Sequence, residues 1–281
     1  MKKRVLLFVN PYKQNAESFT DSIISFLRKE DADCVVEKFS SYDKTGILKQ
    51  KFDFIITLGG DGTLLKAIHE FHSLCIPFFA INNGTLGFIT PYTKADWKDG
   101  LKKTLEGSFA CSKRILLRIR HLKKTKVLKE DICVNEVYLH RPQFRSVIRI
   151  KASVNDEVFA GPLCADGVIV ATPTGSTAYS MAAGASILSN DMKAFLFMPN
   201  NPFMSMDRGL VFTEKAKLRL TLMENEKSNE GIIDCDGVFF SEFKSDEKLD
   251  ISIYEKTVRI IRNPALSEFE RIGNKLEWLK K

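Results

Sequence analysis

A glycine-rich segment with a single carboxylate follows a short apolar run in the first quarter of the chain. Residues 57–66 read Thr-Leu-Gly-Gly-Asp-Gly-Thr-Leu-Leu-Lys and come directly after an apolar run at 54–56. A strand that runs into such a turn at the start of a helix leaves backbone N–H groups free to bind a phosphate. Gly59, Gly60 and Gly62 remove side-chain bulk where the backbone must approach a ligand. The segment therefore predicts a phosphate-handling turn.

Asp61 is the group in this turn that could do chemistry. A carboxylate in an anion-binding turn repels phosphate unless it holds a metal ion, orients a nucleophile or takes up a proton. A purely structural interpretation also exists, because Gly-Asp-Gly turns are common caps and aspartate suits the start of a helix.

A second polar segment follows an apolar run in the second half of the chain. Residues 166–180 read Asp-Gly-Val-Ile-Val-Ala-Thr-Pro-Thr-Gly-Ser-Thr-Ala-Tyr-Ser, so an aspartate precedes a buried strand that ends in a hydroxyl-rich loop. A short helix is expected around 178–183. The loop offers neutral donors and acceptors, which suit a sugar, an amide or the edge of a base. The alternative is that Ser176 or Thr177 caps an ordinary helix.

Two shorter polar sites give weaker signals. Asn82-Asn83-Gly84 follows the apolar run 76–81, so it should lie beside the first turn in the sheet. Asn135-Glu136 interrupts an apolar strand, where polar residues usually need a partner or a ligand. A strand edge that faces water is the plainer explanation of that pair.

The first hundred residues alternate strand and helix patterns. Short apolar runs indicate strands at 4–10, 34–39, 54–58 and 76–81. Apolar residues at helical spacing indicate helices at 16–29, 64–72 and 93–107. This order predicts an α/β domain with a parallel sheet and helices on its faces. Ligands of such sheets bind at the carboxyl ends of the strands, where the glycine-rich turn must lie.

From about residue 109 the apolar pattern changes from a period of 3.6 to a period of 2. Strand-like runs follow at 114–120, 146–154, 218–223, 231–235 and 249–254, separated by turns such as Asn155-Asp156. They predict a mostly antiparallel, β-rich second domain over 109–262. A last amphipathic helix is expected over 267–278, with Ser267 as its cap and Glu270 three positions on.

Composition restricts the classes of protein that the chain can belong to. Its 281 residues can form one large or two ordinary domains, and the net charge of +7 suits an anionic ligand but falls short of that of a nucleic-acid-binding protein. The six cysteines have no paired spacing, as expected for reduced thiols of a cytoplasmic protein. The apolar stretch at 5–9 is too short for a signal peptide, and no stretch approaches the ~20 residues needed to cross a membrane.

Several tempting signals are discounted. His69 and His72 are three residues apart but no third metal ligand is evident. The basic run 113–129 alternates with apolar residues and predicts a solvated hairpin face, or a face that attracts a polyanionic substrate. The P-loop pattern and the third glycine of a dinucleotide fingerprint are both absent, so neither standard nucleotide fold is supported.

Together these motifs resemble those of the bacterial-type NAD kinases in order and spacing. The motifs are Gly-Gly-Asp-Gly-Thr at 59–63, the asparagine and glycine segment at 82–88, Asn-Glu at 135–136, and the long string from Asp166 to Tyr179. The likeness extends to Asp236-Gly237 and to the terminal Lys-Leu-Glu-Trp at 275–278. Diacylglycerol and sphingosine kinases share the first motif, but the Thr-Pro-Thr-Gly-Ser-Thr-Ala-Tyr string distinguishes this chain from them.

The resemblance implies transfer of a phosphoryl group from ATP, or from polyphosphate, to the adenosine ribose 2′-hydroxyl of NAD. Asp61 would be the proton acceptor, Asn135 and Glu136 would contact the ribose, Asp166 the nicotinamide amide, and the segment 177–179 the adenine region. The residues expected to bind the substrates are Gly59, Gly60, Asp61, Gly62, Thr63, Lys66, Phe88, Asn135, Glu136, Asp166, Thr177, Ala178, Tyr179 and Ala182. A divalent metal ion, expected to be Mg²⁺, would come with ATP, and no residue is assigned as its ligand.

The resemblance also implies an arrangement of domains and subunits. The C-terminal segment should pack on the first domain, so the expected domains are 1–108 with 263–281, carrying the phosphate turn, and 109–262, which would bind NAD. The expected partners are NAD and ATP, with neither nucleic acid nor membrane, in a homodimer or homotetramer.

Four positions depart from the family pattern, and two other functions remain as alternatives. Ala182, Phe203 and Gly209 stand where the family commonly has serine, histidine and proline, and Cys164 where many relatives have arginine. These changes bear on substrate preference and regulation. The alternatives are a non-catalytic NAD(P)-binding sensor, which would be expected to have lost Asp61, and a lipid or sugar kinase of the same superfamily, which should expose a membrane-facing apolar surface.

Overall fold

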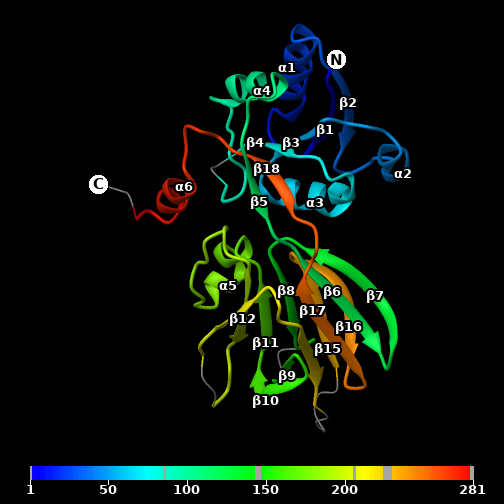
Figure 1. Cartoon of the computed structure of the whole chain (residues 1–281), viewed down its shortest axis with the longest axis vertical. Helices are drawn as coiled ribbons and strands as arrows, with labels where there is room; N and C mark the ends of the chain where they lie inside the picture. The colour runs from blue at the N-terminus through cyan, green and yellow to red at the C-terminus, as the bar shows by residue number, and fades with distance from the viewer. Residues whose placement is uncertain (1, 85–86, 143–146, 205–206, 224–229, 279–281) are drawn as a thin grey trace. The chain divides into compact units, whose positions relative to one another are not determined.

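The chain folds into two compact units. The computed structural model describes residues 2–84, 87–142, 147–204, 207–223 and 230–278. The first unit comprises residues 1–113 and 258–281, and the second comprises 114–257. Each unit has its own sheets and its own hydrophobic core (Figure 1).

The first unit is an α/β domain built on a six-stranded sheet of order β2-β1-β3-β4-β18-β5. Its strands are β1 (Arg4–Val9), β2 (Asp33–Lys38), β3 (Phe54–Gly59), β4 (Phe78–Asn82), β5 (Cys111–Arg114) and β18 (Val258–Ile261). Its helices are α1 (Ala16–Lys29), α2 (Lys44–Leu48), α3 (Asp61–Phe71), the 3₁₀ turn η1 (His72–Leu74), α4 (Trp97–Leu105) and α6 (Glu268–Lys275). The pairings of β1 with β2 and β3, and of β4 with β3 and β18, are parallel.

Helices cover both faces of this sheet, which explains its uninterrupted apolar strands. On one face, alternate residues of β1, β3 and β4 pack with α1 and α4, where Trp97 lies between Phe19 and Phe26. On the other face, Phe8 of β1 meets Phe71 of α3 edge to face. A strand buried on both sides has no polar alternation, so its sequence is a continuous apolar run.

The second unit consists of two six-stranded sheets. The first, of order β10-β9-β14-β17-β6-β7, contains β6 (Leu117–Lys123), β7 (Lys126–Cys133), β9 (Ile148–Val154), β10 (Glu157–Ala165), β14 (Leu218–Leu222) and β17 (Glu247–Ile253). The second, of order β13-β12-β11-β8-β15-β16, contains β8 (Glu136–His140), β11 (Gly167–Ala171), β12 (Ala194–Asn200), β13 (Leu210–Thr213), β15 (Glu230–Cys235) and β16 (Val238–Lys244). Every pairing recorded within these two sheets is antiparallel.

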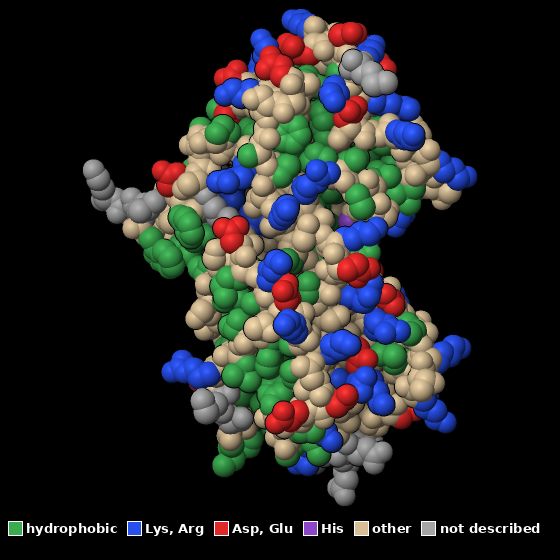
Figure 2. Space-filling view, in the orientation of Figure 1, with side chains coloured by type: hydrophobic (Ala, Val, Ile, Leu, Met, Phe, Trp, Pro, Cys, Tyr) green, Lys and Arg blue, Asp and Glu red, His purple; other side chains and the backbone are tan. Residues whose placement is uncertain are grey.

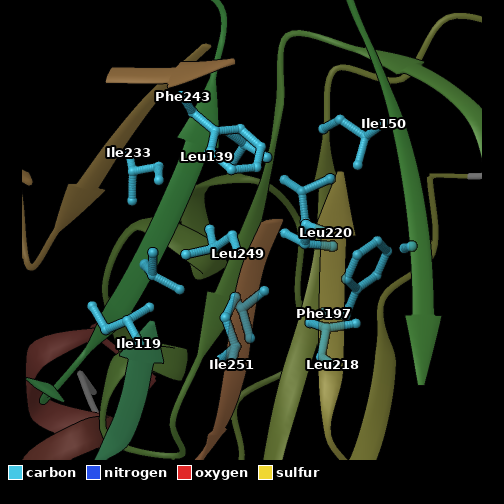
Figure 3. Close-up of a cluster of buried hydrophobic side chains, with 14 of the residues drawn as sticks. Ile119, Leu139, Ile150, Phe197, Leu218, Leu220, Ile233, Phe243, Leu249 and Ile251 are labelled. Atoms are coloured by element: carbon cyan, nitrogen blue, oxygen red, sulfur yellow. The ribbon is translucent and has the colours of Figure 1, made fainter. Parts of the chain in front are cut away.

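The core of the second unit lies between its two sheets. Side chains from β6, β9, β14 and β17 of one sheet meet those from β8, β12, β15 and β16 of the other (Figure 3). The cluster includes Ile119, Leu220 and Leu249 on one side and Leu139, Phe197 and Phe243 on the other. Residues of period 2 along each strand supply it, as expected for strands with one buried face.

The second sheet also buries part of its other face. Ile169 and Ala171 of β11 and Leu196 and Met198 of β12 form a smaller cluster there with Leu188. The segment after β11 contributes to this cover and contains the 3₁₀ turn η2 (Gly175–Thr177) and the short helix α5 (Tyr179–Ala182). This face carries the polar residues of the second candidate site.

The expected fold class is confirmed, and one expected strand is wrong. The run 114–120 is not one strand: β5, which joins the sheet of the first unit, ends at Arg114 on the boundary, and β6 begins at Leu117 in the second unit. The chain crosses between units within a continuous apolar and basic pattern, so periodicity could not show the break. The last helix has the expected capping box between Ser267 and Glu270, and it belongs to the first unit.

Some of the charges in the basic run 113–129 are paired with carboxylates. Arg118 pairs with Glu130 and Glu255, and Arg120 pairs with Glu130. Lysine and arginine side chains on the face shown in Figure 2 are interspersed with acidic ones. All six cysteines are free thiols. Within the described ranges, no helix has both the length and the apolar character needed to span a bilayer.

Two phenylalanines of β16 provide a matched test of the sandwich core. Phe243 is fully buried in the core cluster, whereas Phe239 on the same strand is 60% exposed. We expect Phe243→Ala to lower the free energy of unfolding by about 3 to 5 kcal/mol, because it leaves a cavity. Phe239→Ala should stay within about 0.5 kcal/mol of the parent. Urea denaturation measures both, and equal losses would contradict the placement of β16.

Candidate functional site

The glycine-rich turn lies at the carboxyl end of β3, as the sequence predicts. β3 ends at Gly59, Gly60 caps α3, and Asp61 is the first residue of that helix. The backbone N–H of Asn83 donates to the carbonyl of Gly59 (2.7 Å), so the segment after β4 lies directly beside the turn. Both polar segments therefore meet at one edge of the parallel sheet.

The carboxylate of Asp61 is fixed by three donors from the segment that follows β4. Oδ2 accepts the backbone N–H of Phe88 (2.7 Å), and Oδ1 accepts the Thr90 hydroxyl (2.9 Å) and the N–H of Ile89 (3.3 Å). A carboxylate offers about four acceptor positions. Oδ2, with one donor, therefore keeps room for a further hydrogen bond.

A buried hydrogen-bond chain orients the Thr90 hydroxyl. The side-chain amide of Asn82 donates to Thr90 Oγ1 (3.0 Å), and the hydroxyl proton then points to Asp61. Asn82 Oδ1 in turn accepts the N–H of Gly84 (2.8 Å). A Cβ atom on Gly87 would collide with the Asp61 carboxylate, so glycine is required there by space. Sequence analysis did not single out Thr90 or Gly87 by function.

The three glycines of the turn have different structural roles. A Cβ on Gly59 would overlap the Thr63 side chain, which itself accepts a hydrogen bond from Asn10 Nδ2 (3.3 Å). Gly60 and Gly62 have open space where a Cβ would stand. Gly59 is therefore needed for packing, whereas the other two leave room beside the N–H groups at the start of α3.

Lys66 points away from this carboxylate toward the end of β2. Its ammonium donates to the carbonyl of Phe39 (3.0 Å) and lies 4.1 Å from the centroid of the Phe39 ring. Phe88, another expected binding residue, is partly buried and has the ammonium of Lys275 of α6 5.6 Å from its ring. The role of both residues in binding stays a prediction.

In the second unit, the Asn-Glu pair is held by Asp236. The carboxylate of Asp236 accepts the backbone N–H groups of Val134 (2.8 Å), Asn135 (2.7 Å) and Glu136 (3.0 Å). The N–H of Asp236 donates back to the carbonyl of Glu136 (2.9 Å). This clamp fixes the backbone where β7 gives way to β8, and it explains why polar residues interrupt the apolar strand.

Glu136 does not face water, contrary to the plainer explanation of its position. Its side chain is 8% exposed, and its Oε2 is buried without a hydrogen-bond partner. Burial first, and then the charge of Asp236, raise its pKa to about 8, against the lowering effect of a hydrogen bond from the backbone of Tyr179. Asn135 Oδ1 is also buried without a partner. A buried polar atom without a partner costs free energy, and a ligand is one way to supply the partner.

Glu136 lines a pocket of about 610 Å³ on the face of the sheet opposite the sandwich core. Glu136, Tyr138 and His140 alternate along β8 and share that face. Their partners on β11 are Ala171, Ile169 and Gly167, so small residues stand beside Glu136 and His140. A Cβ on Gly167 would collide with the Leu139 carbonyl and the Tyr138 ring. The small residues Gly167 and Ala171 of β11 thus leave space for the pocket beside β8.

Asn200 joins two tyrosines at one side of the pocket. Its amide donates to the hydroxyls of Tyr138 (2.7 Å) and Tyr179 (3.3 Å), whose rings meet edge to face. The Tyr138 ring also stacks on His140 at 4.6 Å. This network makes the wall both aromatic and polar, which suits a heteroaromatic ring.

Asp166 lines the same pocket and is paired. Its Oδ2 contacts Arg141 Nη2 (3.1 Å) and accepts the amide of Asn201 (3.1 Å). Tyr179, which follows the hydroxyl-rich loop, also lines this pocket, whereas the residues of the loop itself do not. Two of the departure positions also meet, because the N–H of Phe203 donates to the carbonyl of Cys164 (2.7 Å).

The alternative role of Ser176 and Thr177 as helix caps is wrong. Ala178 is the N-cap of α5, without a side-chain hydrogen bond. Ser176 Oγ donates to the carbonyl of Pro173 (2.6 Å), and Thr177 Oγ1 donates to that of Thr174 (3.2 Å). These hydroxyls fix the loop rather than the helix. Ala182, the last residue of α5, carries no polar side-chain atom.

The structure adds residues that sequence reasoning missed. They are Asn82, Gly87 and Thr90 in the first unit, and Tyr138, His140, Arg141, Asn200, Asn201 and Asp234 in the second. The period-2 spacing of Tyr138 and His140 from Glu136 could have indicated a shared face. Two asparagines at the end of the apolar strand β12 were a comparable signal. Asn82 had been noticed only for its place in the sheet.

The donor set of the first unit does not form a metal cage. Among the residues described, there is no group of three or more histidine, cysteine, aspartate or glutamate side chains able to hold a metal ion. Asp61 already accepts three hydrogen bonds. Such residues fit Mg²⁺ that keeps waters and is carried by substrate phosphates, which is its common mode of binding.

Comparison with known proteins gives consistent results over almost the whole chain. Two family models match: the ATP-NAD kinase N-terminal domain over residues 36–109 and the ATP-NAD kinase C-terminal domain over 134–263. An NAD kinase of Treponema denticola is 31% identical, covering 98% of this chain and 96% of the relative. One of Borrelia garinii subsp. bavariensis is 30% identical, covering 98% and 100%.

Solved structures share the fold. A yeast NADH kinase complexed with NADH superposes with a TM-score of 0.90 at 21% identity, covering all of this chain and 89% of the other. An NAD kinase from Archaeoglobus fulgidus in complex with ATP gives a TM-score of 0.77 at 22% identity, covering 98% of both chains.

The raised pKa of Glu136 makes a prediction about stability. A folded-state pKa of about 8, above the ordinary 4.5, means that the folded protein holds a proton that the unfolded chain releases. Stability from this residue is therefore greatest below its unfolded pKa and falls as pH rises toward 8. Glu136→Gln lacks the titrating group and does not lose this stability. The difference in unfolding free energy between Glu136→Gln and the parent should therefore increase, as pH rises through this window, by up to about 1.4 kcal/mol per pH unit.

Urea denaturation at pH 5, 6.5, 8 and 9 measures this difference between the two proteins. The gain should level off above about pH 8. Glu242→Gln, at an exposed position of β16, serves as the control and should show no such trend. A gap between Glu136→Gln and the parent that stays constant with pH would contradict the raised pKa.

Proposed function

This chain belongs to the NAD kinase family, and we propose that it transfers the terminal phosphoryl group of ATP to the adenosine ribose 2′-hydroxyl of NAD, giving NADP. The observation that carries the proposal is the carboxylate of Asp61. It stands at the start of α3 beside open glycines, fixed by three donors, with room on Oδ2 for one more.

The glycine-rich turn binds the phosphates of ATP in this proposal. The N–H groups at the start of α3 have no intrahelical partners, and the helix dipole favours an anion there. Gly60 and Gly62 present no side chain that would keep a phosphate from the backbone. Thr63, whose side chain is buried and accepts a hydrogen bond from Asn10, would bind phosphate through its backbone N–H. Lys66 adds positive charge at the neighbouring strand end.

Asp61 accepts the proton of the attacking hydroxyl. Phosphoryl transfer needs little covalent chemistry from the protein, and most of the rate comes from positioning and from neutralising charge. The Phe88 and Ile89 N–H groups and the Thr90 hydroxyl keep the carboxylate in one orientation. Oδ2 can then receive the alcohol proton as the oxygen becomes nucleophilic.

A divalent metal ion, expected to be Mg²⁺, would neutralise charge on the phosphate oxygens of ATP when bound. The turn residues would hold it through those oxygens. Asp61 is thereby left to handle the proton of the alcohol.

The second unit supplies the residues that recognise NAD. Asn135 and Glu136 would contact ribose, Asp166 the nicotinamide amide, and residues 177–179 the adenine region. The pocket beside these residues, its aromatic wall and its unpartnered polar atoms support this assignment. We take residues 109–262 as the NAD-binding domain and 1–108 with 263–281 as the domain that carries the phosphate turn.

The alternative functions find less support. A non-catalytic sensor has no use for the three donors that orient Asp61. A lipid kinase should present an apolar membrane-binding surface, and no such segment was evident in the sequence. We retain polyphosphate as a second donor to be assayed, and we expect a homodimer or homotetramer, which sedimentation would test.

Replacement of Asp61 tests the reaction and the role of this residue together. Purified protein with ATP, Mg²⁺ and NAD should produce NADP, measured with an NADP-specific dehydrogenase. Asp61→Asn keeps the shape of the side chain but removes the proton acceptor, so turnover should fall by at least about two orders of magnitude. The affinity for NAD should change little. Near-normal turnover would remove Asp61 from this role, and NAD binding without product in the parent would favour the sensor.

Substitutions of Gly59 and Gly60 distinguish a defect in phosphate binding from a defect in folding. In Gly60→Ala the new methyl group occupies open space, so the protein should fold like the parent. The KM for ATP should rise about tenfold, equivalent to one weakened charge-assisted hydrogen bond. In Gly59→Ala the new methyl group collides with the Thr63 side chain, so the free energy of unfolding should fall by about 1 to 3 kcal/mol. Thermal denaturation and ATP titration distinguish the two, and an unchanged KM in Gly60→Ala would place the phosphates elsewhere.

A further inference from the structure

We propose that Glu136 binds the dinucleotide as a neutral carboxylic acid, whose O–H donates a hydrogen bond to an uncharged acceptor atom of the ligand. This inference rests on the proposed function, because it describes how the same pocket recognises its substrate. It concerns the protonation state of the residue and therefore the direction of its hydrogen bond.

The surroundings of Glu136 supply too few donors for a carboxylate. The side chain is 92% buried, and Oε2 has no partner. Its one recorded donor is the backbone N–H of Tyr179. An ionised carboxylate in so dry a place needs several donors or a cation to offset its lost hydration.

Asp236 takes the negative charge instead. Its carboxylate accepts three backbone N–H groups at 2.7 to 3.0 Å, and backbone N–H groups stabilise the charged form of an acid. Its charge then acts directly against ionisation of Glu136. Where two acids lie together in unequal surroundings, the one with fewer donors keeps the proton. The geometry therefore assigns the proton to Glu136.

The other polar groups near Glu136 do not reverse this assignment. On the β7 side, the buried Cys133 thiol donates to the Glu136 carbonyl (3.0 Å), and the neighbouring Cys235 thiol is buried as well. Burial raises the pKa of both thiols.

The two basic side chains that line the pocket are each held by another acid. His140 Nε2 lies 3.0 Å from Asp234, and Arg141 Nη2 lies 3.1 Å from Asp166. Tyr138 and Tyr179 also line the pocket, and their hydroxyl oxygens accept hydrogen bonds from the Asn200 side-chain amide.

A neutral Glu136 suits a dinucleotide for two reasons. The diphosphate of the ligand is negatively charged, so a second anion in the pocket would repel it, whereas an acid does not. The O–H of Glu136 also supplies a donor, whereas a carboxylate could only accept. A donor at this position matches a ribose hydroxyl oxygen or an acceptor nitrogen of a purine.

Calorimetric titration of the intact protein with NAD, without ATP, tests the proton directly. Runs at pH 7, 8 and 9 in buffers of different ionisation enthalpy give the number of protons taken up on binding. We expect uptake of about half a proton at pH 8, approaching one at pH 9, and a Kd at pH 9 about tenfold above that at pH 7.

Three variants test whether the proton uptake comes from Glu136. Glu136→Gln keeps an N–H donor without a titrating group, so it should bind NAD with no Glu136-linked uptake and with a Kd that changes little from pH 7 to 9. Glu136→Ala should bind more weakly at every pH. The exposed Glu242→Gln control should behave like the parent.

Two NAD analogues identify the acceptor. One lacks the 3′-hydroxyl of the adenosine ribose, and the other carries hypoxanthine in place of adenine. The analogue that binds without proton uptake has lost the acceptor, and if both retain full uptake the hydrogen bond goes to neither group and the proposal is overturned.

Failure of this inference is distinguishable from failure of the proposed function. If NAD binds and NADP forms, but binding takes up no proton at pH 8 and Glu136→Gln binds at least tenfold more weakly than the parent at pH 7, Glu136 is a carboxylate and the kinase assignment stands. If the parent neither binds NAD nor makes NADP, both are overturned.

Discussion

The reactive end of the first unit depends on the three hydrogen bonds that hold Asp61. Backbone N–H groups of Phe88 and Ile89 and the hydroxyl of Thr90 fix the carboxylate, and all three come from the segment after the neighbouring strand β4. The geometry of the turn is therefore set by the sheet register that brings the ends of β3 and β4 together. Gly87 is part of the same constraint, because a side chain there would displace the carboxylate. A helix start alone would leave the group free to rotate.

The second unit uses the same physical device for another purpose. Asp236 also accepts hydrogen bonds from backbone N–H groups of a distant segment, residues 134–136. Its carboxylate fixes the backbone of that segment. The group it positions, Glu136, is left short of donors and facing a pocket. Two carboxylates thus acquire different charge states through the number of N–H groups each receives. Small residues on β11 then provide the room for a ligand beside the neutral one.

Much of this arrangement could be predicted from the sequence where local chemistry decides it. The strand and glycine turn and the capped last helix depend on short-range patterns, and the structure agrees with them. The break at 115–116 could not be predicted, because it depends on which unit each strand joins. Thr90 was missed for a similar reason, because its role depends on hydrogen bonds to residues of other segments, which spacing along the chain does not reveal.

Two of the positions that depart from the family pattern lie together in the second unit. Phe203 and Cys164 replace a basic side chain each, and a backbone hydrogen bond joins them. Positive charge beside Asp166 comes from Arg141, which contacts its carboxylate while Asn201 donates to the same oxygen. Asp166 is thus already partly satisfied within its own chain. The strength of any further contact to Asp166 is therefore set by Arg141 and Asn201 as much as by the aspartate itself.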